Sequence, residues 1–331
     1  MREKIEKREY LILSPYAAKA AESRGRQTDE PKCEFRTDFQ RDRDRIIYSK
    51  AFRRLKNKTQ VFFSPEGDHY MTRLTHTLDV SQVARSIARG LDLNEDLCEA
   101  ISLGHDLGHT PFGHMGETVL ARLAPNGFKH NEQSLRVVDV LENDGKGLNL
   151  TFEVRDGILN HKKSGNPATL EGRVVSIADR IAYLNHDIED AVRAGVITLK
   201  DLPKETEILG CNSKERINTM ITGICRESEG KNVVTMPEDV KNATETLRDF
   251  MFDRVYMTTE ARGEEARADR MLTTMYEYFL KNKDELPDMY KALLARFPLE
   301  TVVCDYISSM TDRYAVHVFE SMYVPKNFII R

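Results

Sequence analysis

The sequence predicts an all-α protein: a helical bundle that carries one small β-hairpin, followed by additional helices in its C-terminal part. Apolar residues recur at every third or fourth position over most of the chain, which is the periodicity of helices with one buried face. Strand signals are confined to one short run, and the sequence has neither a GxGxxG nor a GxxxxGK(S/T) phosphate loop. These observations favour a helical domain with a few short β pieces in its loops.

Composition and charge exclude several classes of protein. With 331 residues, 40% of them hydrophobic, and a formal net charge of −4, the chain can bury a core and is too apolar for a disordered protein. The mildly acidic balance argues against a nucleic-acid coat protein. Five cysteines without a CxxC pair indicate neither a disulfide framework nor a thiolate zinc site. Since no segment is apolar enough for a signal peptide or a membrane span, we expect a cytoplasmic protein with no membrane partner.

Local signals define the elements in chain order. The strand signal Val61–Phe63 is followed by turn-like residues 64–68 and is expected to pair with His69–Met71 in a hairpin. Asn94 is a helix N-cap by type and position, and Gly195 is a helix stop. The predicted helices are 75–91, 94–107, 111–124, 130–143, 151–162, 170–194, 213–227, 237–258, 264–282, 284–296 and 299–323.

A weak change of composition near 195–212 predicts two parts. Residues 1–195 would form a core with a basic N-terminal segment, and residues 196–331 a helical region packed on that core. Segment 36–58 holds nine Lys or Arg residues and three Asp residues, a local charge of +6. Such runs more often form a solvated helix face. The alternative is that the segment steers a polyphosphate or a nucleic acid.

Histidines concentrate in one third of the chain, since eight of the nine lie between positions 69 and 186. His105 and Asp106 are adjacent after an apolar run, His76 lies on the preceding predicted helix, and Asp179 interrupts an apolar strip. A buried carboxylate such as Asp179 needs a partner. Each of these residues alone is more often structural, but together two imidazoles and two carboxylates suit Mn²⁺, Fe²⁺, Zn²⁺, Mg²⁺ or Co²⁺. The joint pattern therefore predicts a metal site.

The segment after Asp106 is rich in helix-breaking residues and carries further imidazoles. A new helix is expected to begin near Pro111, which makes His114 and Glu117 neighbours on one helix face. A carboxylate beside a histidine orients the ring and raises its pKa, as a general acid requires. His130 begins another predicted helix and is placed to present an imidazole to an anion.

Five motifs in residues 41–195 together resemble one known family. They are AFRRLKNKTQVF at 51–62, TRLTHT at 72–77, HDLGHTPFGH at 105–114, HNEQS at 130–134 and ADRIAYLNHD at 178–187. The chain resembles the HD-domain metal-dependent phosphohydrolases, and within them the deoxyguanosine triphosphate triphosphohydrolases (dGTPases) and dGTPase-like proteins. Residues 196–331 show no motif of this kind.

The resemblance implies a role for individual residues. The implied metal ligands are His76, His105, Asp106 and Asp179. The implied catalytic residues are His114, Glu117 and His130, with His130 near the α-phosphate. The implied substrate-binding residues are Gln60 and Asp187 at the sugar 3′-hydroxyl, Tyr183 against the sugar, and Arg73 and Arg180 near the phosphates. His109 receives no defined role, His161 and His186 are interpreted as structural, and His69 and His317 receive no role.

The resemblance also implies the reaction. Such enzymes hydrolyse a deoxynucleoside triphosphate (dNTP) to deoxynucleoside and triphosphate, with a metal-bound hydroxide attacking the α-phosphorus. Arg73 or Arg180 would neutralise phosphoryl charge, and His114 held by Glu117 would protonate the leaving 5′ oxygen. The family name favours dGTP, and the family implies homo-oligomers (commonly hexamers) and regulation by an effector nucleotide or by single-stranded DNA. The base and the identity of the metal stay open.

Two alternatives remain at this point. The first is another HD-domain phosphohydrolase, acting on nucleoside monophosphates, cyclic dinucleotides or alarmones. The second is a nucleotide-sensing or single-stranded-DNA-binding protein that uses the basic segment 36–58. The complete set of ligand and acid residues argues against the second, because a binding protein has no need of it.

Overall fold

The computed structural model describes residues 1–60, 69–256 and 259–325, and these residues form an all-α fold. Their only β pairing consists of two isolated bridges, Arg26 with Thr151 and Thr59 with Thr72. The all-α prediction is confirmed. The predicted hairpin falls largely on residues 61–68, which lie outside the described part of the chain. None of the helices in the described part is both long and apolar enough to cross a membrane.

Sixteen α-helices make up the described residues, joined by short 3-10 and π-helical turns. The α-helices are α1 (Arg2–Ile12), α2 (Asp38–Tyr48), α3 (Lys50–Arg54), α4 (Arg73–Gly90), α5 (Glu95–Gly104), α6 (Gly113–Leu123), α7 (His130–Arg136), α8 (Glu142–Gly145), α9 (Phe152–Leu159), α10 (Leu170–Arg193), α11 (Ser213–Ser228), α12 (Glu238–Met251), α13 (Thr259–Lys281), α14 (Asp288–Leu293), α15 (Leu299–Ser309) and α16 (Asp312–Tyr323). The short turns are η1 (Ala20–Glu22), η2 (Leu55–Asn57), η3 (Val137–Leu141), η4 (Leu199–Asp201), η5 (Lys204–Leu209), η6 (Phe252–Tyr256) and η7 (Lys283–Glu285).

Helix α5 is the buried centre of the N-terminal half, with α2, α4, α9 and α10 packed around it. Two glycines allow α5 and α9 to approach closely. A Cβ atom on Gly104 would lie 2.5 Å from Ile158, and one on Gly157 would lie 2.5 Å from Ile101. Burying a side chain such as Ile101 completely stabilises the fold by about 1.5–3 kcal/mol. This packing fixes the C-terminal end of α5, where His105 and Asp106 follow.

Helix boundaries follow the expected capping signals. The Asn94 side chain accepts a hydrogen bond from the Leu97 N–H and caps α5, as predicted. Helix α10 ends at Arg193, and Gly195 follows it with a positive φ of 74°. The prediction of one helix over 299–323 is wrong, because α15 ends at Ser309 and Thr311 caps a new helix, α16.

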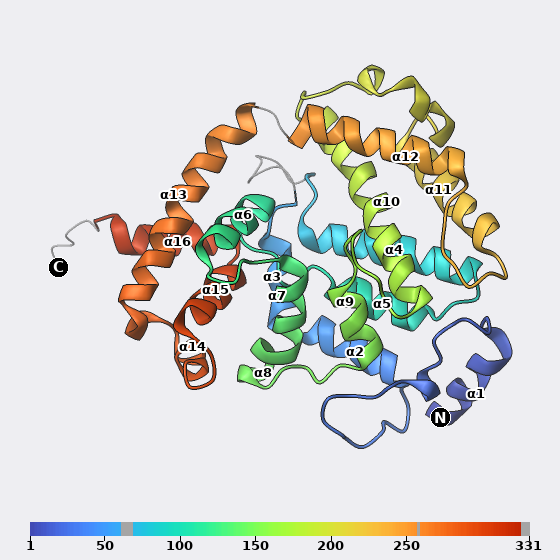
Figure 1. The fold of residues 1–331 in the computed structure, drawn as a ribbon, viewed down its shortest axis with the longest axis horizontal. Coiled ribbons are helices and arrows are strands. Elements are labelled where there is room, and N and C mark those ends of the chain that lie inside the picture. The colour runs from blue at the N-terminus through green and yellow to red at the C-terminus, as the bar shows by residue number, and fades with distance from the viewer. Residues whose placement is uncertain (61–68, 257–258, 326–331) are drawn as a thin grey trace.

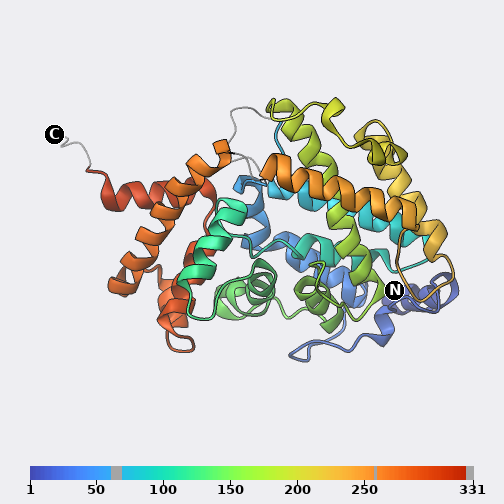
Figure 2. The ribbon, with the colours of Figure 1, turned by 45° about the horizontal axis from the view of Figure 1, so that its top comes forward.

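The helices are spread along the long axis of the molecule, which is horizontal in Figure 1. Helices α13–α16 gather at one end, α1 lies at the other end, and α4, α5, α9 and α10 lie between them. Turning the molecule by 45° shows the same order, with α12 running beside α10 (Figure 2). The central group is therefore in contact with elements from both halves of the sequence.

The basic segment 36–58 forms α2, α3 and η2, and its cations are largely paired within the fold. Six of its nine cations form ion pairs, among them Arg45 with Glu30 at 2.6 Å and Arg43 with Asp96 and Glu99, both at 3.3 Å. Five of these six cations pair with carboxylates outside the segment, and Arg36 pairs only within it, with Asp44. A count within the segment therefore overstates its free charge. The segment is neither the simple solvated face nor the open basic surface that its composition suggested.

Candidate metal centre and active site

Three elements bring four ligand-type side chains together. His76 lies in the first turn of α4, His105 and Asp106 follow α5, and Asp179 lies on α10. His76 Nε2 lies 3.2 Å from Asp179 Oδ1 and 3.7 Å from Asp106 Oδ2. His105 Nε2 lies 3.3 Å from Asp106 Oδ1 and 3.8 Å from Asp179 Oδ1. The structure thus places the four predicted ligands around one point.

The donor atoms at this point fit a divalent metal ion. His76, His105 and Asp106 are buried and form one of the two groups of possible metal ligands in the described residues. The Nδ1 atom of His105 lies 2.6 Å from the carbonyl oxygen of Ser102, so it carries the proton and leaves a lone pair on Nε2. That Nε2 atom is buried and has no hydrogen-bond partner in the described residues. Two imidazole nitrogens with two carboxylates are a usual ligand set for such an ion.

The carboxylates of the site are held in the charged form. Burial alone would raise the pKa of Asp106, but His105, His109 and Arg73 hold it well below its usual range. Burial alone would also raise the pKa of Asp179, but the nearby His76 and His105 outweigh burial and lower it. Arg73 donates to Asp106 at 2.7 Å and is itself buried. The site therefore presents two anionic carboxylates at neutral pH.

A second group of imidazoles adjoins the metal site through Asp106. His109 Nε2 lies 3.1 Å from Asp106 Oδ1, and the His109 ring stacks on His130 with centroids 4.0 Å apart. His130 Nε2 contacts His161 Nε2 at 3.2 Å, and the His161 ring lies 5.0 Å from that of His105. Burial lowers the pKa of His161 to about 3, so its ring is neutral. His109 and His161 therefore adjoin the four ligand-type side chains, although no catalytic role was predicted for either of them.

Glu117 connects the two histidines predicted to be catalytic. Its Oε2 atom lies 2.8 Å from His130 Nδ1 and 3.8 Å from His114 Nδ1. Burial alone would raise the pKa of Glu117, but His114 and His130 lower it strongly. The His114 side chain is 82% exposed, whereas that of His130 is 8% exposed. Glu117 thus hydrogen-bonds His130 and reaches His114 only loosely from the open side.

Comparisons with known proteins show which family the chain belongs to. The HD domain family model matches residues 73–184, and the phosphohydrolase-associated domain model matches residues 234–321. A protein from Caldanaerobacter subterraneus subsp. tengcongensis is 57% identical over 326 residues, which cover 98% of this chain and 96% of that protein. Proteins from Desulfatibacillum aliphaticivorans and Clostridium perfringens are 47% and 48% identical, with 98% of both chains covered in each case. All three are named deoxyguanosinetriphosphate triphosphohydrolase-like protein.

The chain belongs to the deoxyguanosinetriphosphate triphosphohydrolase-like family. The resemblance inferred from the sequence motifs is confirmed. The match at 234–321 is new, because the sequence showed no motif in that region.

In this family member the phosphohydrolase-associated region contacts the metal site's surroundings directly. The carboxylate of Asp312 on α16 accepts from Thr59 and from the backbone N–H of Phe112, the latter at 3.0 Å. Phe112 has a left-handed φ of 62° and precedes Gly113, which begins the helix that carries His114 and Glu117. Asp312 therefore holds the turn that sets the direction of α6.

A buried lysine makes a second connection between the two regions. The Lys58 ammonium donates to the carbonyl oxygens of His109 and Ser308, the latter at 2.8 Å. Burial, with repulsion from Arg54, lowers the pKa of Lys58 well below its usual range. The two bonds tie the loop after Asp106 to the end of α15.

The predicted phosphate and sugar residues come from α4, from α10 and from residue 60. Arg180 on α10 lies 3.4 Å from Glu245 on α12, and Lys163 and Arg248 pair with the same carboxylate at 2.8 and 2.5 Å. Three cations thus share one carboxylate. Gln60 keeps a buried Oε1 atom with no hydrogen-bond partner in the described residues, and its backbone oxygen faces Arg73 at 3.5 Å.

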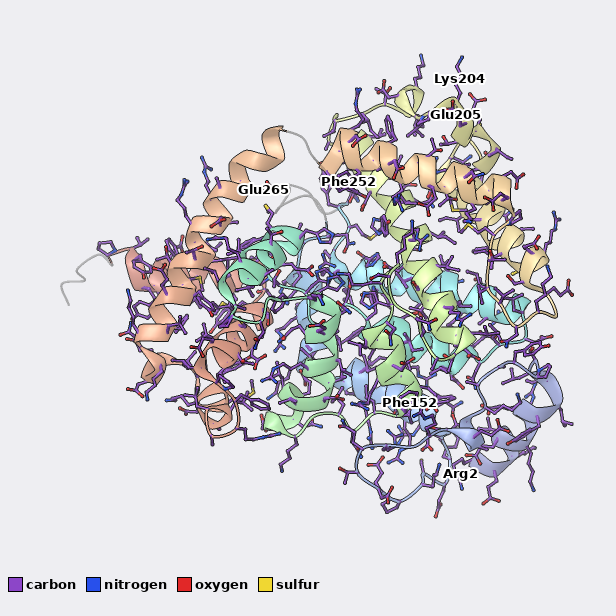
Figure 3. The ribbon with its side chains drawn as sticks, viewed as in Figure 1. Arg2, Phe152, Lys204, Glu205, Phe252 and Glu265 are labelled. Atoms are coloured by element: carbon purple, nitrogen blue, oxygen red, sulfur yellow. The ribbon has the colours of Figure 1, made fainter. Side chains whose placement is uncertain are left out.

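Tyr183 and Asp187 follow Asp179 by one and two turns of α10. Burial raises the pKa of Tyr183, so its hydroxyl stays protonated. The Asp187 side chain is buried, and it accepts a 2.5 Å hydrogen bond from the hydroxyl of Tyr256. Tyr256 ends η6, the π-helical turn that begins at the exposed Phe252 (Figure 3). Tyr256 was not predicted as a site residue, because its aromatic type was the only signal that the sequence offered for it.

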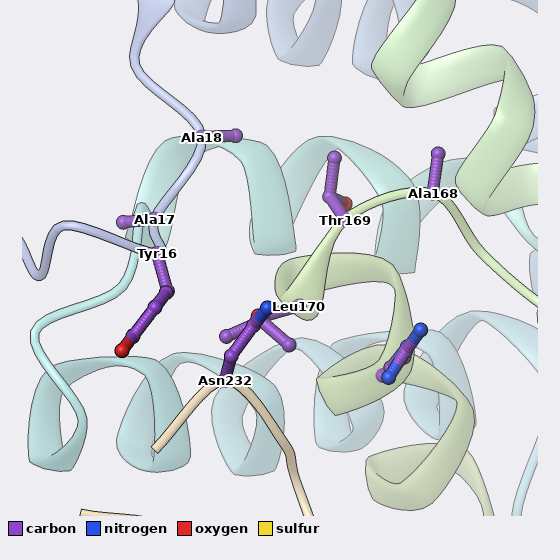
Figure 4. Close-up of a pocket in the computed structure, with 8 residues that line it drawn as sticks. Tyr16, Ala17, Ala18, Ala168, Thr169, Leu170 and Asn232 are labelled. Atoms are coloured by element: carbon purple, nitrogen blue, oxygen red, sulfur yellow. The ribbon is translucent and has the colours of Figure 1, made fainter. Parts of the chain in front are cut away.

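A separate cavity of about 300 Å³ lies at the N-terminal end of α10 (Figure 4). It is lined by Tyr16, Thr169, Leu170, Arg173 and Asn232, among others. Leu170 precedes Asp179 by about two and a half helical turns, so this cavity is not the metal site.

Proposed function

We propose that the chain is a metal-dependent dNTP triphosphohydrolase that converts a dNTP and water to a deoxynucleoside and triphosphate by attack on the α-phosphorus. One observation carries the proposal: His76, His105 and Asp106 form a buried group of metal-type ligands, with an unpartnered imidazole nitrogen on His105. Membership of the family supports the class of substrate, since the relatives are named for dGTP hydrolysis.

A bound divalent ion would lower the pKa of a coordinated water and neutralise charge on the phosphoryl oxygens. His76, His105, Asp106 and Asp179 would hold that ion. Arg73 donates to Asp106 and thereby fixes this carboxylate in position. Its buried guanidinium would also add a positive charge near a phosphate bound to that ion, where charge develops in the transition state.

The leaving 5′ oxygen needs a proton, and we assign its donation to His114. The ring lies on the open side of Glu117, where a substrate can approach it, while Glu117 stays ionised beside it. His130 is fixed by Glu117 at Nδ1, which leaves Nε2 facing the other imidazoles of the site. His130 is therefore suited to contact the α-phosphate and not to move with the leaving group.

Arg180, Lys163 and Arg248 are suited to the β- and γ-phosphates, because three cations around Glu245 leave an excess of positive charge. We assign the sugar to Gln60, Tyr183 and Asp187. Both Asp187 oxygens already face a neighbour, so a 3′-hydroxyl would have to share an oxygen with Tyr256 or displace it.

Several finer points stay predictions. They are dGTP as the preferred dNTP, Mn²⁺, Mg²⁺, Fe²⁺, Co²⁺ or Zn²⁺ as the ion, a homo-oligomer such as a hexamer, an effector nucleotide, single-stranded DNA as a regulator, and a cytoplasmic location. The division of the chain at residue 195 also stays a prediction.

The decisive experiment is product analysis in ¹⁸O-labelled water. Each of the four dNTPs is incubated with the protein and Mn²⁺ or Mg²⁺. The products are separated by ion exchange, and the ¹⁸O content of each is measured by mass spectrometry. We expect equal amounts of deoxynucleoside and triphosphate, with ¹⁸O in the triphosphate because attack on phosphorus breaks the bond to the sugar oxygen. Release of monophosphate with pyrophosphate, or ¹⁸O in the deoxynucleoside, would overturn the proposal.

A further inference from the structure

A chain of buried polar groups leads away from His76 on the side opposite the metal site. His76 Nδ1 lies 2.9 Å from His186 Nε2, and the two rings meet edge to face with centroids 5.1 Å apart. His186 Nδ1 lies 2.8 Å from Asp187 Oδ1, and Asp187 Oδ2 accepts the hydroxyl of Tyr256. His76, His186 and Asp187 are all nearly inaccessible to solvent. Solvent therefore has little access to the contacts among these three residues.

Only one arrangement of protons satisfies the chain when His76 binds a metal ion. A ligating Nε2 needs its lone pair, so His76 carries its proton on Nδ1 and donates it to His186 Nε2. His186 must then carry its own proton on Nδ1, where it faces Asp187. That contact is short but bent away from regular hydrogen-bond geometry, and neither atom has a better partner in the described residues. We infer that His186, held by Asp187 and Tyr256, is a positioning residue that fixes the tautomer and ring orientation of His76 for metal binding.

The helix geometry explains why α10 can supply both a ligand and a support. Asp179 and His186 are seven residues apart, which is about two helical turns, so both project from the same face. That face packs against α4, which carries His76. Asp179 contacts His76 at Nε2 and His186 contacts it at Nδ1, so α10 holds the ring from both nitrogens. This inference rests on the proposed function, because it needs an ion at Nε2.

Tyr256 extends the support into the second half of the chain. It belongs to η6, and its hydroxyl is donated to Asp187 at 2.5 Å, which leaves the other carboxylate oxygen for His186. Without that hydroxyl, the carboxylate loses the bond that sets its rotation. The orientation of a metal ligand in the HD domain would thus depend on a residue of the phosphohydrolase-associated region.

The test measures Co²⁺ binding to chelator-treated protein, by visible absorption and by competition with a chelator of known affinity. His186→Phe keeps the ring and removes both nitrogens, and His186→Gln restores an oxygen that can accept from His76. Asn185→Ala is the matched control, since Asn185 is an equally buried neighbour on α10 that bonds Arg216 instead. Thermal unfolding of each metal-free variant reports the purely structural effect.

We expect His186→Phe to weaken Co²⁺ binding about 10- to 100-fold and to alter the absorption band, as loss of such outer partners does. His186→Gln should recover most of the Co²⁺ affinity. Asn185→Ala should lower the melting temperature and leave the Co²⁺ affinity unchanged. Wild-type affinity and spectrum in His186→Phe, or equal weakening by Asn185→Ala, would overturn the inference. If His186→Phe does not fold, Tyr256→Phe replaces it, with a smaller loss expected and unchanged affinity counting against the inference. Failure of the wild-type protein to bind one Co²⁺ would instead overturn the proposed function, and the inference with it.

Discussion

Glu171 offers a sharp test of the buried electrostatics, because it is a buried carboxyl group that forms no ion pair within the described residues. It is the second residue of α10 and is completely buried. Its Oε1 atom accepts the backbone N–H groups of Ala18 and Asn94, both at 3.0 Å, while Oε2 has no hydrogen-bond partner in the described residues. Burial outweighs these donors and raises the pKa of Glu171 from 4.5 to about 7.

The sign and size of the effect on stability follow from that pKa. The folded state binds the proton more tightly than the unfolded state, so Glu171 stabilises the fold fully only below about pH 4.5 and loses that contribution as the pH rises through 7. The whole difference corresponds to about 3.4 kcal/mol at 1.36 kcal/mol per pH unit. About 2.5 kcal/mol of it falls between pH 5 and pH 8. A glutamine at this position does not ionise and removes the effect.

The assay is urea unfolding of the wild-type protein and of Glu171→Gln at several pH values, followed by far-ultraviolet circular dichroism. We expect the free energy of unfolding of Glu171→Gln, relative to wild type, to rise by about 2.5 kcal/mol from pH 5 to pH 8. The matched control is Glu205→Gln, the same change at an exposed position of η5, which should run parallel to wild type. Parallel curves for Glu171→Gln as well would refute the reasoning.

Three further predictions concern the active site. His114→Ala should abolish turnover at unchanged metal content, because the side chain is exposed and outside the ligand group; loss of metal by elemental analysis would make His114 a ligand. Asp106→Ala should lose both metal and activity, since Asp106 belongs to both groups of possible metal ligands in the described residues, one with His76 and His105 and one with His109 and His130. Normal metal occupancy would contradict that role. Asp312→Asn places an amide NH₂ group against the backbone N–H of either Thr59 or Phe112. The loss of that hydrogen bond should lower the free energy of unfolding by about 1–3 kcal/mol. It should lower kcat at unchanged metal content, whereas a wild-type kcat in steady-state assays would show that the turn before α6 holds without it.

The grouping of the four ligand-type side chains could be predicted from the sequence because these residues stand out chemically where they occur. Asp179 interrupts an apolar strip on a long helix, and a buried charge there needs a counterpart. His105 and Asp106 end a helix that is buried on nearly every side. In both places the apolar pattern shows that the polar residue is buried. A buried polar residue needs a partner, and its burial therefore indicates a site.

The support around the ligands could not be predicted in the same way. The partner of His186 is His76, 110 positions earlier, and Lys58 reaches Ser308 across 250 positions. Nothing in the local pattern of either residue specifies such a partner. The same limit applies to the basic segment, because the carboxylate that neutralises Arg54, Glu142, lies on another element. Periodicity tells which face of a helix is buried, but not which distant residue meets it.

The contacts of the C-terminal region bear on where the active site ends. If the HD part were separated near residue 195, the buried Lys58 ammonium would lose the Ser308 oxygen, and Thr59 and Phe112 would lose the Asp312 carboxylate. These contacts lie in buried or half-buried settings, where losing a hydrogen bond costs more than at an exposed position. Lys58 would keep only the His109 oxygen as a partner. Two of the three adjoin the loop that leads from the metal ligands to His114. If the proposed function is right, the HD domain supplies the metal ligands, and the phosphohydrolase-associated region holds the loop that precedes His114.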